Sequence, residues 1–148
     1  MSKVLVAYFS LSGNTEKMAN YIAEGLRFSG QQVTVKKISE IKSVEDLSGY
    51  DGYIFGSPTY HLDAAEPVKT FLFLGKKGNL EAKLGGAFGS YTHTGNAPGI
   101  IMDTMGYVYK MELFELGPLR LKDAVLETPD GMKACQDYGK VFGEKLGS

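Results

Sequence analysis

The chain has 148 residues, the length of one domain, and a domain of this size folds without disulfides or metal. Its 43% hydrophobic and 22% charged residues exclude a disordered or fibrous protein. A formal net charge of −1 argues against a dedicated nucleic-acid-binding protein, and one cysteine excludes a disulfide framework. We find no apolar run of transmembrane length and no signal peptide. The expectation is one cytoplasmic domain over residues 1–148, without membrane insertion.

Short apolar runs predict five strands. The first covers residues 4–9, which form a continuous apolar run typical of a strand buried on both faces. The others are marked, in chain order, by Val33, Val35 and Ile38, by residues 53–55, by residues 86–88, and by Leu113, Phe114, Leu119 and Leu121.

Apolar residues at helical spacing lie between these runs. Met18, Ile22 and Leu26 define a first helix that Gly30 ends. Pro67 and Pro98 mark the first turns of two more helices, and a last apolar stripe follows the N-cap pair at residues 128–129. The alternation predicts a doubly wound α/β domain, with parallel strands and helices on both faces of the sheet.

Ligands of such sheets bind outside the carboxyl ends of the strands. The loop after the first strand combines hydroxyl, amide and glycine residues directly before a helix N-terminus, and so has the donors of a phosphate cradle. It lacks the Walker ending and the G-x-G-x-x-G fingerprint, and a tight turn with an ordinary N-cap is the alternative. Its candidate residues are Ser10, Leu11, Ser12, Gly13, Asn14 and Thr15.

Two further loops carry aromatic, imidazole and hydroxyl groups with little charge. Beside a phosphate cradle, such loops would suit a planar ring with a phosphate tail. The alternative for each residue alone is a loop anchor or a solvated side chain. The candidates are Pro58, Thr59, Tyr60, His61 and Leu62 in one loop, and Ser90, Tyr91, Thr92, His93, Gly95, Asn96 and Ala97 in the other.

Residues 10–16, 56–60 and 86–91 together resemble the flavodoxin family over the whole chain, and most closely the flavodoxin-like domain of flavodiiron proteins. The resemblance implies a flavodoxin-like, doubly wound five-stranded parallel sheet of order 2-1-3-4-5. It also implies noncovalent FMN, with residues 10–15 at the phosphate and the other two loops beside the ring. Only residues 115–118 separate the halves of the fifth strand, which resembles the short-chain type.

Two departures from the family bear on redox properties. Flavodoxins that act as low-potential carriers are typically strongly acidic, whereas this chain has a charge of −1. Many also carry a glycine where this chain has residues 60–62, so the resemblance does not extend to the peptide flip at that glycine. His93, if it lies near the ring, would favour the anionic reduced flavin. We therefore expect less separated one-electron potentials than in acidic flavodoxins.

Other classes of protein with a similar fold need functional residues that this chain lacks. A response-regulator receiver needs acidic residues where residues 9–10 and 57–58 stand, and a low-molecular-weight phosphatase needs a cysteine in the first loop, far from Cys135. The G-x-S-x-G motif of serine hydrolases is also absent from the sequence.

The favoured function is an electron carrier between partner redox proteins, a reductase and an acceptor, acting as a monomer or weak oligomer without metal. An FMN-dependent NAD(P)H:quinone reductase and a non-redox binding module stay open.

Overall fold

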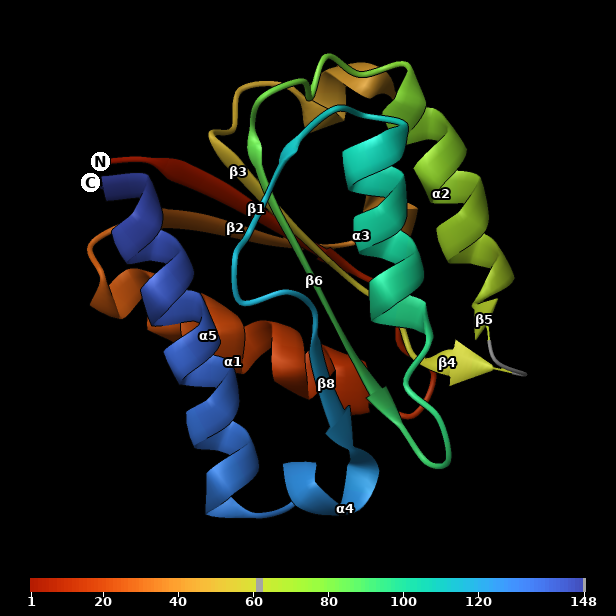
Figure 1. Ribbon diagram of the computed structural model, residues 1–148, viewed down its shortest axis with the longest axis vertical. Coiled ribbons are helices and arrows are strands. Elements are labelled where there is room, and N and C mark those ends of the chain that lie inside the picture. The colour runs from red at the N-terminus through yellow and green to blue at the C-terminus, as the bar shows by residue number, and fades with distance from the viewer. Residues whose placement is uncertain (61–62, 148) are drawn as a thin grey trace.

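A parallel sheet forms the centre of the computed structural model, which describes residues 1–60 and 63–147 (Figure 1). Its strand order is β2-β1-β3-β6, and both β7 and β8 pair with the outer edge of β6. The predicted order 2-1-3-4-5 is thus confirmed, with the fifth strand in two pieces. The strands are β1 (Lys3–Tyr8), β2 (Gln32–Lys37), β3 (Gly52–Gly56), β6 (Leu84–Tyr91), β7 (Glu112–Leu113) and β8 (Leu119–Lys122).

Helices cover both faces of the sheet. Helices α1 (Asn14–Phe28) and α5 (Pro129–Gly147) cross one face, and α2 (Glu66–Lys76) and α3 (Ala97–Tyr107) cover the other (Figure 1). The predicted helices are therefore confirmed. Short elements complete the chain: the hairpin β4 (Thr59–Tyr60) and β5 (Asp63–Ala64), α4 (Asp123–Leu126), and the 3-10 helices η1 (Ile38–Glu40) and η2 (Val44–Leu47).

The apolar pattern explains this layering. Met18, Ile22 and Leu26 of α1 are all fully buried against the sheet, and burying each such side chain contributes about 1.5–3 kcal/mol. Strand β3 is buried along its whole length, as expected for a central parallel strand covered on both faces. Among the described residues, no helix is long and apolar enough to cross a bilayer.

The connection from β2 to β3 differs from the strict strand–helix alternation. It holds only η1 and η2, and Ile38, expected in the second strand, lies in η1. The Glu40 carboxylate accepts the Lys37 backbone N–H at 2.8 Å, and this capping turns the chain out of the strand. The β2–β3 connection consequently adds no long helix to the face that α2 and α3 cover.

The fifth strand is interrupted by a turn. Phe114 is buried and its N–H donates to the Gly85 carbonyl oxygen at 2.8 Å, after which Gly117 takes φ +72° and donates back to Phe114. Pro118 lacks an N–H and cannot continue the ladder. Pairing resumes at Leu119, opposite Phe88.

Helices α1 and α5 approach each other closely. A methyl group built at Gly139 would lie 2.1 Å from the Ile22 carbonyl oxygen and 3.0 Å from the Leu26 backbone nitrogen. Backbone atoms cannot move aside as a flexible side chain does, so only glycine fits this position in α5.

We predict that Gly139→Ala lowers the free energy of unfolding by about 1–3 kcal/mol, because the added methyl forces the two helices apart. Gly99→Ala in α3 is the control, since a methyl group there meets nothing within 4 Å. Its stability should be unchanged or up to about 1 kcal/mol higher. Urea denaturation measures both, and equal stabilities for the two variants would contradict the close packing.

Candidate functional site

The predicted ligand loops meet at one edge of the sheet. Tyr8, Gly56 and Phe88 are register partners across β1, β3 and β6, so these strands reach the same edge. The ladder extends past Gly56, because the Phe9 N–H donates to the Gly56 oxygen and the Ser57 N–H to the Phe88 oxygen, both at 3.1 Å. The three loops therefore leave the sheet side by side.

The first loop exposes the N-terminus of α1. Gly13 takes φ +91°, a conformation that favours glycine, and a methyl group there would meet nothing within 4 Å. The Ser10 hydroxyl oxygen accepts the Gly13 N–H at 3.0 Å, which shapes the turn. The Ser12 hydroxyl oxygen accepts the Asn14 N–H at a long 3.5 Å, and the N-cap residue Gly13 has no side chain to cap α1. The N-terminus of α1 is therefore open to an anion.

Thr15 links the first loop to the third. Its hydroxyl oxygen lies 3.1 Å from that of Ser90, and both residues are almost completely buried. The two candidates, 75 positions apart, are thus brought together. This hydrogen bond fixes the start of α1 against the end of β6.

A carboxylate stands beside the same helix end. Tyr8 donates its hydroxyl to Glu16 at 2.5 Å, and burial, followed by this hydrogen bond, raises the pKa of Tyr8 well above its usual value. The phenol therefore stays protonated and donates. Glu16 lies in the first turn of α1, where the helix dipole favours a negative charge.

The second loop forms the β4–β5 hairpin, which is held from both sides. The Thr59 hydroxyl oxygen accepts the Ala97 N–H at 2.9 Å, which joins the hairpin to the start of α3. Asp63 forms an ion pair with Lys69 of α2, and this contact, with the Ala64 N–H, holds the pKa of the Asp63 carboxyl below its usual value. The candidates His61 and Leu62 lie outside the described residues.

The third loop runs over residues 92–96 to α3. Thr92 donates its hydroxyl to Asp123 at 2.9 Å, while His93 and Asn96 are exposed. The half-buried Tyr91 ring packs under Gly95: a methyl group there would lie 2.9 Å from the ring. The Tyr91 ring therefore anchors the loop by packing against Gly95.

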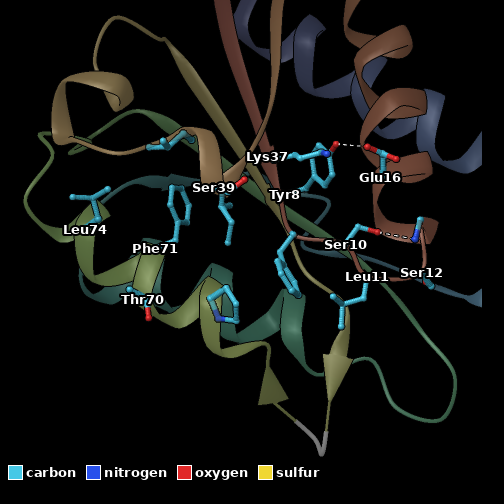
Figure 2. A pocket seen from close by; sticks show the side chains of 15 residues that line it. Tyr8, Ser10, Leu11, Ser12, Glu16, Lys37, Ser39, Thr70, Phe71 and Leu74 are labelled. Atoms are coloured by element: carbon cyan, nitrogen blue, oxygen red, sulfur yellow. Dashed lines mark hydrogen bonds between the residues drawn. The ribbon is translucent and has the colours of Figure 1, made fainter.

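A groove of about 930 Å³ adjoins the first loop (Figure 2). Figure 2 shows Phe71 and Leu74 of α2 on one side and Leu11 with the Tyr8–Glu16 pair on the other. Pro58, Thr59 and the residues of the third loop are not among its described lining residues. The groove lies beside η1 in the β2–β3 connection, which contains no long helix.

Sequence reasoning missed several neighbours of the site. Lys37, Thr70 and Phe71 line the groove, and Arg120 of β8 packs against the third loop. Arg120 is exposed in the alternating burial pattern of Leu119–Lys122, and its contact with the loop depends on the register of β8 with β6. No local pattern contains that information.

Cys135 is fully buried on α5, among the core residues of that face. Burial raises the pKa of its thiol to about 12, so it stays protonated at neutral pH. Cys135 therefore packs in the core of this face, where its protonated thiol is a poor nucleophile.

A family model described as "Flavodoxin domain" matches residues 5–99. The chain belongs to the flavodoxin family. A curated relative of this flavodoxin domain, named NAD(P)H dehydrogenase (quinone), comes from Rhodopseudomonas palustris (strain TIE-1). It is 35% identical over 113 residues, covering 61% of this chain and 57% of the relative. The chain spans little more than half the length of the curated relatives it matches.

Solved structures agree with the family. A flavodoxin from the domain Archaea is 28% identical, with a TM-score of 0.89 and 99% coverage of both chains. A flavodiiron core from Synechocystis sp. PCC6803 is also 28% identical, with a TM-score of 0.84, covering 99% of this chain and 36% of that one. The resemblance to flavodoxins and to the flavodoxin-like part of flavodiiron proteins is thus confirmed.

Membership of the flavodoxin family implies a flavin cofactor. The residues present fit one: the uncapped N-terminus of α1, with open space at Gly13, suits a phosphate. The loops after β3 and β6 flank the same edge, and Thr59 fixes their separation. In this flavodoxin domain both carboxylates nearest the hairpin, Asp63 and Glu66, lie within 4 Å of the Lys69 ammonium.

We predict that Thr59→Val lowers the free energy of unfolding by about 1–3 kcal/mol, because the Ala97 N–H loses its acceptor. Amide exchange at Ala97 should become faster. Thr59→Ser retains the hydroxyl and should restore both properties. Thr92→Val is the matched control: its hydrogen bond is exposed, so stability should change by less than about 0.5 kcal/mol. Unchanged exchange at Ala97 in Thr59→Val would refute this link.

Proposed function

We propose that this chain binds FMN noncovalently and carries electrons between partner redox proteins. The observation that carries the proposal is the uncapped N-terminus of α1 beside two loops at one sheet edge. The FMN phosphate would accept hydrogen bonds from the first loop, through backbone N–H groups and the side chains of Ser10, Ser12, Asn14 and Thr15. No cation is required there, because neutral donors and the helix dipole suffice.

The second and third loops would hold the flavin ring from its two sides. Bound FMN supplies one- and two-electron transfer, so the chain's own residues need only position the ring and limit its contact with water. Pro58, Thr59 and Tyr60 would form one side, with His61 and Leu62, and Ser90 to Ala97 the other. The hydrogen bond from Ala97 to Thr59 supports a preformed slot.

The proposed partners are a reductase and an acceptor that reach the flavin at this sheet edge. We place the carrier in the cytoplasm. The 28% identity to an archaeal protein titled a flavodoxin, over 99% of both chains, supports the carrier role.

Thr15 provides the test of the phosphate site. Thr15→Val keeps the shape of the side chain but removes its hydroxyl, and we expect FMN to bind on the order of tenfold more weakly. Riboflavin, which lacks the phosphate, should lose much less affinity. Quenching of flavin fluorescence measures both dissociation constants.

Thr104→Val is the control, because that hydroxyl donates within α3, to the Ile100 oxygen at 3.0 Å. It should bind FMN like the parent protein. Equal weakening of FMN and riboflavin by Thr15→Val would remove Thr15 from the phosphate site. A parent protein that binds no flavin would leave the non-redox binding module as the better function.

A second candidate function is an NAD(P)H:quinone oxidoreductase. The curated relatives carry that name at 35–36% identity, although the chain spans only 57% of their length. Such an enzyme needs space for a nicotinamide and a quinone at the ring. The two functions would use the same loops and differ in the electron donor.

Anaerobic mixing with NADPH separates the two functions. For a carrier, we expect the FMN-loaded protein to keep its yellow absorbance for minutes with excess NADPH and to bleach only when a flavodoxin reductase is added. Stopped-flow absorbance at 450 nm measures the rate. Prompt bleaching by NADPH alone, followed by reoxidation with a soluble quinone, would establish the reductase instead.

A further inference from the structure

Arg120 of β8 is a charged residue that packs against the third loop. Strand β8 pairs in parallel with the end of β6, which places Arg120 opposite Gly89 and Lys122 opposite Tyr91. Leu119 and Leu121 turn toward the core, while Arg120 and Lys122 are exposed. The register thus brings two cations to the strand end from which the third loop starts.

The Arg120 side chain reaches the loop itself. A methyl group built at Gly95 would lie 3.1 Å from the Arg120 Cδ and 2.9 Å from the Tyr91 Cδ1. Arg120 and Tyr91 therefore pack on the same glycine, and the guanidinium group lies beside a loop proposed to flank the flavin. The side-chain stem supplies this packing while the charge stays in water.

The carboxylates near the third loop and the hairpin have other hydrogen-bond or ion-pair partners. Asp123 accepts the Thr92 hydroxyl, and the hairpin carboxylates Asp63 and Glu66 lie against Lys69. Within residues 1–60 and 63–147, Arg120 lies in no ion pair. The Arg120 guanidinium group is therefore not held in an ion pair and can interact with a charge that develops beside the third loop.

We propose that Arg120 is a specificity-determining residue that favours the reduced, anionic flavin over the oxidised, neutral one. This inference rests on the proposed FMN site. Reduction adds two electrons and one proton to the neutral ring, which leaves one negative charge. A nearby cation lowers the free energy of that charged form and leaves the neutral form almost unaffected. In the test below, dithionite supplies the electrons and water the proton.

The experiment compares the dissociation constants of oxidised FMN and dithionite-reduced FMN for the parent protein and its variants. We expect Arg120→Gln to weaken binding of reduced FMN by roughly three- to tenfold more than binding of oxidised FMN. By the thermodynamic cycle, a tenfold difference lowers the two-electron potential by about 30 mV. The difference should shrink at high salt, because Arg120 is exposed.

Two variants separate charge from packing. Arg120→Lys keeps the charge and should behave like the parent protein. Arg27→Gln removes the chain's only other arginine, exposed in the last turn of α1, and should change neither constant. Equal effects of Arg120→Gln on both redox forms, or an Arg120→Lys variant that behaves like Arg120→Gln, would overturn this inference alone. Failure of the parent protein to bind FMN would overturn it together with the proposed function.

Discussion

The parallel hydrogen-bond ladder through β1, β3 and β6 is the constraint on which the site depends. Its register sets Tyr8, Gly56 and Phe88 side by side, and two further backbone bonds continue it into the loops. A slip of one residue in either pairing would turn the fully buried Leu5 or Ile54 to the opposite face. Burial of these strands on both faces therefore fixes where the loops start, and with them the position of α1 and the hairpin.

Hydrogen bonds from side chains fix the positions of the three loops relative to one another. The buried Thr15–Ser90 pair holds the first and third loops together, and the Thr59–Ala97 bond holds the second and third. Because these bonds form within the protein alone, the candidate site is largely preorganised. Preorganisation lowers the entropy lost on binding, which suits a cofactor held without a covalent bond.

Most of the charged side chains near the candidate site have a specific ion-pair or hydrogen-bond partner. Lys69 lies against both carboxylates at the hairpin, and Tyr8 donates to Glu16 at the helix end. Arg120, by contrast, lies in no ion pair in the described part of the chain, beside the third loop. A formal charge of −1 for the chain therefore says little about the electrostatic field at the candidate site, which depends on the charged side chains within one or two Debye lengths.

The sequence by itself determined the α/β class and the loops that form the candidate site, because apolar periodicity and proline and glycine signals act over a few residues. The strand order came from the resemblance of residues 10–16, 56–60 and 86–91 to the flavodoxin family. The sequence also predicted the phosphate cradle, since Ser10–Thr15 is contiguous and lies directly before a helix. Only the tertiary structure showed that Thr15 bonds to Ser90, that Ile38 leaves the strand, and that Arg120 packs against Gly95. The Thr15 and Arg120 contacts join residues 75 and 25 positions apart, and they exist only once strand pairing has closed the chain between them.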